Sequence, residues 1–281
     1  MAHHPHLELL DGRYRLGEVI ARGNFGTVHA GEDIALGRSV AVKLVRDSPD
    51  GRVSERVFRE ARAAAQTQHP AVVTVFAHGS VPELGVSYVV MERLYGEDLA
   101  QRLGREGRLS VDATRQVGLD VADLLACVHL AGVVHRDIKP ANIYLGRRGR
   151  GTEEVRVLDF GIAKKEEYST LTEPGEVLGS FGYMAPEQLL GEEADARCDV
   201  FGLGAVLYEC LAGRPAYPQT HLPTLLSTML AGPPAGLAAQ CPELPASLHA
   251  AVERALSADP GARFASGAEL RDALAAAAGV P

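Results

Sequence analysis

Strand-like and helix-like patterns are segregated along this chain, and the change between them falls near Gly96. Before Gly96, short Val-rich runs are separated by Gly, Asp or Pro, which is typical of strands joined by turns. These runs cover residues 14–21, 27–32, 40–45, 72–77 and 86–91. After Gly96, apolar residues recur at helical spacing instead. The order predicts an α+β fold with a small β-rich part, a larger helical part and a cleft between them.

One helix is predicted among the strands. Ser54 is a candidate N-cap, and Val57 and Ala61 lie at helical spacing after it. The helix must end before Pro70, because proline disfavours helical backbone in the residue that precedes it.

The second part predicts long helices over residues 110–131 and 197–212. The second of these is apolar on nearly all sides, as a centrally buried helix requires. Ser266 and Glu269 predict a capping box at the start of the last helix. Residues 146–154 are polar and predict a solvated loop.

Charge and composition exclude several classes of function. The net charge of −8 and pI of about 5.7 oppose a nucleic-acid partner or an anionic lipid partner, because proteins that bind these are usually basic. No apolar run is long enough to span a bilayer, so no direct membrane contact is expected of this segment. The four cysteines form no CxxC pair, which predicts reduced thiols in a cytoplasmic protein.

Residues 21–28, Ala-Arg-Gly-Asn-Phe-Gly-Thr-Val, lie between two predicted strands. Glycines in such a loop let backbone N–H groups approach phosphate oxygens. A plain hairpin turn explains the same glycines, so the loop alone is a weak signal. A dinucleotide-binding fold needs a helix after the turn, whereas a strand follows here.

Lys43 stands in the middle of the apolar strand 40–45. Because an unpaired lysine facing a core is rarely tolerated, a counter-charge is expected, and Glu60 on the following helix can supply it. The ammonium group is then placed to contact nucleotide phosphates. A lysine on the solvent side of an edge strand is the alternative, but its neighbours do not alternate between polar and apolar.

The most informative motif is His-Arg-Asp-Ile-Lys-Pro-Ala-Asn at residues 135–142, followed by Asp159-Phe160-Gly161. Phosphoryl transfer needs a carboxylate to orient and deprotonate a hydroxyl, a cation to neutralise developing charge, and oxygen ligands for Mg²⁺. Asp137 fits the first role and Lys139 the second. Asn142 and Asp159 fit the third. Each residue alone has ordinary explanations in a loop, but the combination at these spacings points to phosphoryl transfer.

With these motifs in this order, the chain resembles the eukaryotic-like protein kinase family over residues 12–275. The resemblance implies a bilobal fold, with an ATP-binding N-lobe over residues 12–94 and a catalytic and substrate-binding C-lobe over residues 95–278. It implies transfer of the γ-phosphate of ATP to protein hydroxyls, with Mg²⁺ as the metal and Mn²⁺ as a substitute. Residues 182–188 resemble the bacterial branch in particular.

The resemblance also implies a set of nucleotide-binding positions. The loop over the phosphates comprises Ile20, Ala21, Arg22, Gly23, Asn24, Phe25, Gly26, Thr27 and Val28. Ala41 and Lys43 follow on the next strand, and Lys43 with Glu60 is the family's ion pair. Met91 takes the gatekeeper position, and Glu92 to Leu94 form the adenine hinge. Asp98 takes the position of the ribose contact.

The same resemblance assigns the chemistry. Asp137 is implied to accept the hydroxyl proton, and Asn142 and Asp159 to hold the metal. Lys139, two positions after Asp137, is the form found in serine/threonine kinases, which implies protein substrates that bear Ser or Thr.

Two structural contacts are implied in the C-lobe as well. Glu187, which ends the Ala-Pro-Glu motif of the activation segment, is expected to pair with Arg263. Asp199, on the buried helix, is expected to brace the catalytic loop.

Regulation by phosphorylation is implied by the arginine that precedes the catalytic aspartate. In kinases of this type Arg136 awaits a phosphate on the activation segment, and by the family's geometry Arg56 and Lys164 face the same pocket. Three neighbouring cations repel one another until a phosphate arrives. The favoured acceptor is Thr172, then Thr170, with Ser169 as a further candidate. A homodimer that supports autophosphorylation is a related expectation.

One departure from the family pattern affects the phosphate loop. Ala21 replaces its first glycine, and because alanine disfavours positive φ and stiffens a turn, altered ATP affinity is predicted. Ser180 replaces the usual threonine and keeps the hydroxyl.

Two other classes of function are alternatives to the protein kinase hypothesis. A pseudokinase scaffold usually lacks one of the catalytic residues, whereas Lys43, Asp137, Asn142 and Asp159 are all present. A small-molecule phosphotransferase, such as an aminoglycoside or choline kinase, generally lacks the Ala-Pro-Glu motif at 185–187. The chain is also compatible with the cytosolic domain of a longer membrane-anchored protein.

Overall fold

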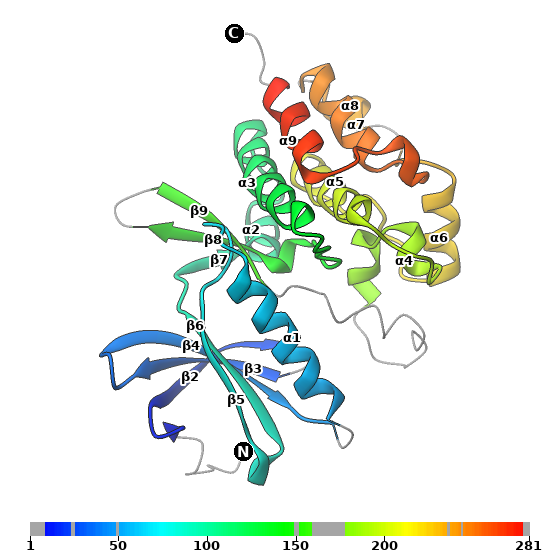
Figure 1. The fold of residues 1–281 in the computed structure, drawn as a ribbon. Helices are drawn as coiled ribbons and strands as arrows, with labels where there is room; N and C mark the ends of the chain where they lie inside the picture. Colours follow the sequence, from blue (N-terminus) through cyan, green and yellow to red (C-terminus); the bar gives the residue numbers. More distant parts are fainter. Residues whose placement is uncertain are drawn as a thin grey trace. The chain divides into compact units, whose positions relative to one another are not determined.

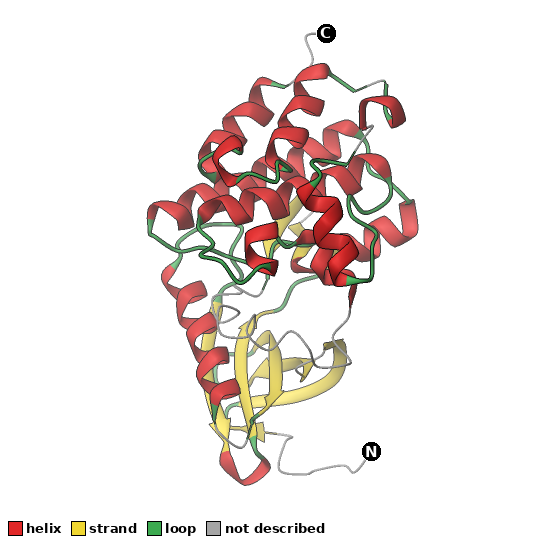
Figure 2. Cartoon of the chain, turned by 90° about the vertical axis from the view of Figure 1, so that its right-hand side faces the viewer, coloured by secondary structure: helices red, strands yellow, loops and turns green. Residues whose placement is uncertain are grey.

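The computed structural model describes residues 9–23, 26–48, 51–148, 152–158, 178–234, 237–242 and 244–277. The chain divides into two compact units, Met1–Gln68 with Val72–Tyr95, and His69–Ala71 with Gly96–Pro281 (Figure 1). Strands make up most of the first unit and helices most of the second, as the colours of Figure 2 show. The α+β fold predicted from the segregated patterns is therefore confirmed.

The first unit is built on an antiparallel sheet with the strand order β1-β2-β3-β4-β6-β5. Its strands are β1 (Leu9–Leu10), β2 (Tyr14–Gly23), β3 (Gly26–Asp33), β4 (Arg38–Arg46), β5 (Val75–Val81) and β6 (Val86–Glu92). One face of β4 carries Val40, Val42 and Leu44, which form a buried cluster with Tyr88 and Val90 of β6. Alternation along the strands therefore buries this face in an apolar core.

Helix α1 (Arg52–Gln66) packs on the sheet through the opposite face of β4. Val57 and Ala61, four residues apart in α1, contact Val45 of β4 and Val89 of β6. The helix begins earlier than predicted, so Ser54 lies inside it and is not its N-cap. The Ser54 hydroxyl donates to Asp47 instead. The strand predicted over residues 72–77 is also shifted, because β5 begins at Val75.

The second unit is mostly helical. Its α-helices are α2 (Leu99–Glu106), α3 (Val111–Leu130), α4 (Pro186–Leu189), α5 (Ala196–Ala212), α6 (Leu222–Leu230), α7 (Leu237–Gln240), α8 (Ala246–Ala255) and α9 (Gly267–Ala276). Helix α5 is buried along nearly its whole length, as its apolar sequence predicts. Helices α3 and α8 pack against it, and α9 lies along α3 (Figure 1).

A small antiparallel sheet accompanies these helices, with β7 (Gly96–Asp98), β8 (Ile143–Arg148) and β9 (Thr152–Val157) side by side. The loop predicted over residues 146–154 is therefore wrong in large part, since Gly146 pairs with Glu154 across the β8–β9 hairpin. Glycine and charged residues in a hairpin have the composition of a loop, because composition does not register backbone pairing.

Two further predictions concern helix boundaries and membrane spans. Ser266 precedes α9, but its side chain makes no capping hydrogen bond, and Glu269 accepts from the N–H of Ala265 at 3.0 Å. The predicted capping box is therefore wrong. The N–H of Gly267 instead donates to Nδ1 of His129 at 3.2 Å. Within the described ranges, no helix has the length and apolar character that crossing a membrane requires.

Candidate active site

The glycine-containing loop is the turn between β2 and β3. Gly23 pairs with Gly26 across it, while Asn24 and Phe25 at its tip lie outside the described residues. A Cβ atom on Gly26 would stand 1.8 Å from the carbonyl oxygen of Leu44. The close approach of β3 to β4 therefore requires glycine at this position, independently of any ligand.

Ala21 occupies a strand position and not a turn. It pairs with Val28 across β2 and β3, and it is exposed. Among the residues that the structure describes, positive φ at a non-glycine residue occurs only at Asp11 and Arg136. The expected conflict between alanine and positive φ is therefore wrong, because extended backbone accepts alanine without strain.

Lys43 lies on the face of β4 that packs against α1. Because side chains alternate along a strand, Lys43 shares its face with Ala41 and Val45, and Val45 contacts α1. Glu60 immediately precedes Ala61, through which α1 packs on the sheet. The Glu60 side chain lies outside the described part of the structure. The Lys43–Glu60 pair stays a prediction that this placement favours.

The segment predicted to hold adenine begins at the end of β6. Met91 pairs with Ala41 of β4. Glu92 is tied twice to Thr74, through its N–H to the Thr74 carbonyl at 2.9 Å and through Oε1 to the Thr74 N–H at 2.8 Å. Leu94 follows and is half-buried. These bonds order the backbone of the segment, while its adenine-binding role stays a prediction.

Asp98 ends β7 and caps α2. Its Oδ1 accepts the N–H of Gln101 at 2.8 Å, and Oε1 of Gln101 accepts the N–H of Asp98 at 3.3 Å. This reciprocal capping box holds the carboxylate in one direction. Capping alone explains an aspartate here, but a carboxylate has further lone pairs that a ribose hydroxyl can reach.

The structure brings Asp137, Lys139 and Asn142 together in the catalytic loop. Nζ of Lys139 lies 3.0 Å from Oδ2 of Asp137. Nδ2 of Asn142 donates to Oδ2 and to the backbone carbonyl of Asp137, both at 2.9 Å. The two charged side chains are 10% and 19% exposed, so the carboxylate is held in place and only slightly open to solvent. This is the arrangement that a positioned proton acceptor needs.

Asn142 is also suited to hold a divalent cation. Its amide nitrogen is used by two bonds to Asp137, so the amide oxygen is the atom left for a ligand. Amide and carboxylate oxygens are the donors that Mg²⁺ prefers. The second predicted ligand, Asp159, lies outside the described residues, although Leu158 before it donates its N–H to the Asn142 carbonyl at 2.8 Å.

Asp199 of α5 braces the catalytic loop through hydrogen bonds to its backbone, as predicted. Its two oxygens accept the N–H of His135 at 2.7 Å and the N–H of Arg136 at 2.6 Å. Arg136 has a φ of +66°, a backbone conformation that costs free energy for a residue with a side chain. Hydrogen bonds to a buried carboxylate are strong enough to offset that cost.

Glu187 and Arg263 form the predicted pair in the interior of the second unit. The contact is bidentate, with Nη1 and Nη2 of Arg263 at 2.6 and 2.9 Å from the two Glu187 oxygens. The remaining guanidinium N–H groups bond to backbone carbonyls, including that of Ser257 at 2.7 Å. Because every donor has an acceptor, a buried charge is tolerated here.

Several residues that hold these elements in place had no predicted role. His129 bonds through Nε2 to Asp199 at 2.9 Å and through Nδ1 to the start of α9. The Tyr183 hydroxyl donates to Glu209 at 2.5 Å. Burial raises the pKa of Glu209, so its carboxyl is less readily ionised than in solvent. These partners are distant in sequence, so no local pattern could have found them.

Several predicted residues fall outside what the structure describes. They are Asn24, Phe25, Asp159, Lys164, Ser169, Thr170 and Thr172, together with the side chains of Arg56, Glu60 and Ser180. The metal ligation by Asp159 and the phosphorylation sites stay predictions.

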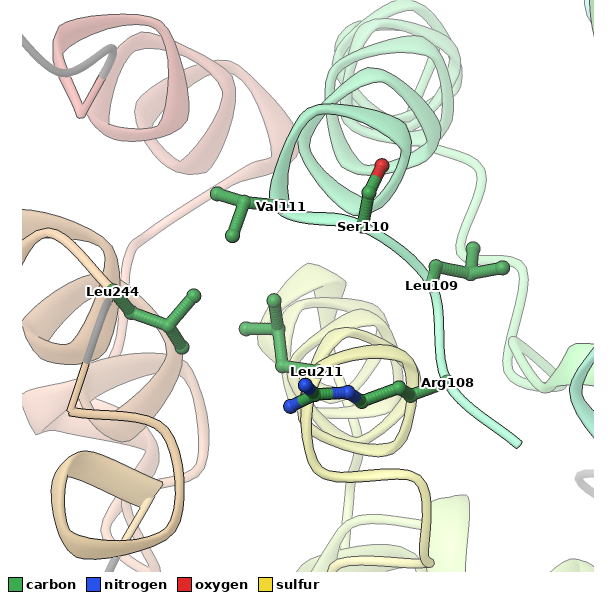
Figure 3. A pocket seen from close by; sticks show the side chains of 6 residues that line it. All are labelled: Arg108, Leu109, Ser110, Val111, Leu211 and Leu244. Atoms are coloured by element: carbon green, nitrogen blue, oxygen red, sulfur yellow. The ribbon is translucent and has the colours of Figure 1, made fainter. Parts of the chain in front are cut away.

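A cavity of about 340 Å³ lies in the second unit, away from the catalytic loop (Figure 3). Val111, Leu211 and Leu244 point into it from α3, α5 and the segment before α8, and Arg108 reaches its edge. None of the predicted site residues lines it. The cavity therefore has no part in the site described above.

Comparison with known proteins identifies what this chain is similar to. A family model described as "Protein kinase domain" matches residues 14–268. The serine/threonine-protein kinase PknA of Mycobacterium tuberculosis is 38% identical over 272 residues, which cover 95% of this chain and 62% of PknA. A probable serine/threonine-protein kinase of Streptomyces coelicolor is 37% identical, over 93% of this chain and 39% of that protein. The chain thus spans less than two thirds of the length of these curated relatives.

Solved structures give the same picture of the fold. The crystal structure of the PknI kinase domain of Mycobacterium tuberculosis superposes with a TM-score of 0.73 at 26% identity, covering 97% of this chain and 99% of that one. A double mutant of the same domain gives a TM-score of 0.75.

Proposed function

The chain belongs to the protein kinase domain family, in its bacterial serine/threonine branch, and from that premise we propose that it transfers the γ-phosphate of ATP to Ser and Thr hydroxyls of proteins. Members of this family use ATP and a divalent metal. The observation that carries the proposal is the contact set of Asp137, Lys139 and Asn142, which joins a held carboxylate, a cation and an amide group in one loop.

Asp137 is the proposed proton acceptor. The acceptor hydroxyl oxygen bonds to the γ-phosphorus, the bond from that phosphorus to the β,γ-bridging oxygen breaks, and ADP leaves with the bonding electrons. The hydroxyl proton passes to the Asp137 carboxylate. Lys139, 3.0 Å from Asp137, is placed to offset negative charge on the transferred group. Asp199 holds the loop through its bonds to the backbone at 135 and 136.

Asn142 and Asp159 are the proposed metal ligands, with Mg²⁺ as the preferred ion and Mn²⁺ as a substitute. The metal supplies charge neutralisation for the phosphate oxygens when it is bound. We assign nucleotide binding to residues 12–94, with Lys43 and Glu60 as an ion pair, and catalysis and substrate binding to residues 95–278. The need for ATP favours a cytoplasmic location for this domain.

Protein acceptors are proposed over small molecules because of the segment that ends at Glu187. The buried Glu187–Arg263 pair and the Tyr183–Glu209 bond anchor this segment to the helical core. An anchored surface next to the catalytic loop suits an extended peptide acceptor. Phosphorylation at Thr172 or Thr170 is proposed to attract Arg136 and order the segment, with a second copy of the chain as a source of the phosphate.

The test is transfer of radiolabelled phosphate from ATP to a Ser/Thr-containing protein, with an aminoglycoside acceptor assayed alongside. The proposal expects label on the protein and none on the aminoglycoside. Binding of Mg-ATP without transfer to any acceptor would support a pseudokinase instead.

Mass spectrometry after incubation with Mg-ATP would locate phosphate at 170 or 172, and its absence from active protein would reject the regulatory step alone.

A further inference from the structure

An ion-pair network joins α2 to the small sheet that follows the catalytic loop. Arg102 of α2 donates from Nε to Oε1 of Glu97 at 2.5 Å and from Nη2 to Oε1 of Glu153 at 2.7 Å. Glu97 lies in β7 and Glu153 in β9, so one guanidinium connects three elements. The Arg102 and Glu97 side chains are 18% and 25% exposed, so salt screens their ion pair less than a fully exposed pair, whereas Glu153 is 45% exposed.

These three elements lie next to the residues proposed to bind nucleotide and metal. Asp98 follows Glu97 in β7 and caps α2. It pairs with Tyr144 of β8, the strand that begins directly after Asn142. The position of the Asp98 carboxylate relative to Asn142 therefore depends on how β7 and α2 are held on the β8–β9 hairpin, beside which they lie in Figure 1.

Strand pairing alone gives β7 little support. The strand has three residues, and its first, Gly96, has a φ of +150° and faces β8 so closely that a Cβ atom would stand 2.0 Å from the Leu145 carbonyl oxygen. Glycine permits this approach but contributes no side chain to hold it. The bonds of Arg102 add an attachment, because they tie the first turn of α2 to β7 and to β9.

We propose that Arg102 is a positioning residue for nucleotide binding, which sets the position of the Asp98 carboxylate relative to Asn142 by fixing α2 and β7 to β9. The inference rests on the proposed function and on the ribose contact assigned to Asp98. Both carboxylate partners of Arg102 must be ionised for this role. The hydrogen bonds from Arg105 and Arg102 lower the pKa of Glu97 to about 2, so it carries its charge throughout the physiological range.

Arg105 provides a matched control within the same helix. It also contacts Glu97, at 2.6 Å, but its side chain is 56% exposed and its other ion-pair partner is Glu106 of α2 itself. Replacing Arg105 therefore removes a charge and a bond to Glu97 while leaving the bridge from α2 to β9 in place.

The experiment compares KM values for ATP and for 2′,3′-dideoxy-ATP, which lacks the ribose hydroxyls. A lost hydrogen bond to a charged group predicts that the unmodified protein prefers ATP by about tenfold. Arg102→Gln should reduce this preference to about twofold with little change in kcat, and Arg105→Gln should retain it. Arg102→Lys should restore the preference only in part, because an ammonium cannot reproduce the guanidinium fork.

Asp98→Ala separates failure of the inference from failure of its premise. If Asp98→Ala abolishes the preference and Arg102→Gln does not, the positioning role is overturned while the ribose contact stands. If Asp98→Ala keeps the preference, the ribose contact and the inference both fail, and phosphate transfer to protein still tests the kinase proposal separately. Should Arg102→Gln not fold, Glu153→Ala removes the β9 carboxylate that Arg102 contacts. A reduced preference in that variant supports the inference, and an unchanged one overturns it.

Discussion

The catalytic loop and the β2–β3 turn are held in place in different ways. In the catalytic loop the side chains of Lys139 and Asn142 both contact the Asp137 carboxylate, and Asp199 accepts hydrogen bonds from the loop backbone. Across the β2–β3 turn the described residues are held by backbone pairing, and residues 20–23 are exposed. The difference fits the two proposed roles, because a group that accepts a proton must be fixed to a fraction of an ångström, whereas backbone that binds phosphates needs only the right path.

The largest effect is expected from the catalytic carboxylate. Asp137→Asn should lower kcat by about 10²- to 10⁴-fold, because the amide cannot accept the hydroxyl proton. ATP affinity should change little, since nucleotide contacts are assigned to other residues. Steady-state kinetics with a protein acceptor and a direct ATP-binding measurement would check both points. Turnover equal to that of the unmodified protein would show that another group takes the proton.

The buried pair of the second unit and an exposed pair of the first offer a matched contrast. Glu187→Gln should lower the free energy of unfolding by about 3–5 kcal/mol, because it leaves the buried Arg263 charge without its partner. Arg15→Gln breaks the Arg15–Glu32 pair, whose side chains are 61% and 48% exposed, and should cost less than about 1 kcal/mol. Urea unfolding of the two variants would measure the difference. Equal shifts would contradict the idea that burial decides the strength of these pairs.

The stability of the first unit should depend on pH through the ion pairs of Asp33. Asp33 accepts two bonds from Arg13 at 2.8 Å and one from Arg38 at 3.3 Å. The Arg13 bonds lower the pKa of Asp33 to about 2, against about 4 in an unfolded chain. The carboxylate therefore stabilises the fold above pH 4, and this contribution disappears as the pH falls through 2. Asp33→Asn should melt at lower temperature than the unmodified protein at pH 6.

The gap between the two melting temperatures should then narrow as the pH is lowered towards 2. A gap that stays constant over this range would show that Asp33 acts through packing and not through its charge.

The smallest effect is expected at Ala21. Because Ala21 has extended backbone in β2, Ala21→Gly should change the KM for ATP by no more than about threefold and reduce stability by about 0.5–1 kcal/mol. Kinetics at saturating acceptor and a melting curve would measure the two quantities. A hundredfold change in KM would show that residue 21 does more than continue a strand.

Local patterns in the sequence predicted much of the fold and the core of the site. The Val-rich run of β4 and the apolar run of α5 predicted their elements closely, because each is encoded in consecutive residues. The motif at residues 135–142 likewise grouped Asp137, Lys139 and Asn142 as parts of one site, and the structure places them in contact within six positions of the chain. Where local signals compete, the predicted helix boundaries were wrong. Ser54 lies in the first turn of α1, and its hydroxyl donates to Asp47, which precedes the helix.

What supports the site was decided by tertiary structure. His129 meets Asp199, and Arg102 meets Glu153, across 70 and 51 positions of the chain. Neither His129 nor Arg102 belongs to a motif, because a histidine or arginine on a helix has no preferred partner until folding brings one within reach. The sequence by itself predicted which groups perform the chemistry. The folded chain decided which groups hold them still, since packing a helix against a distant strand is a property of the whole core and not of any local stretch.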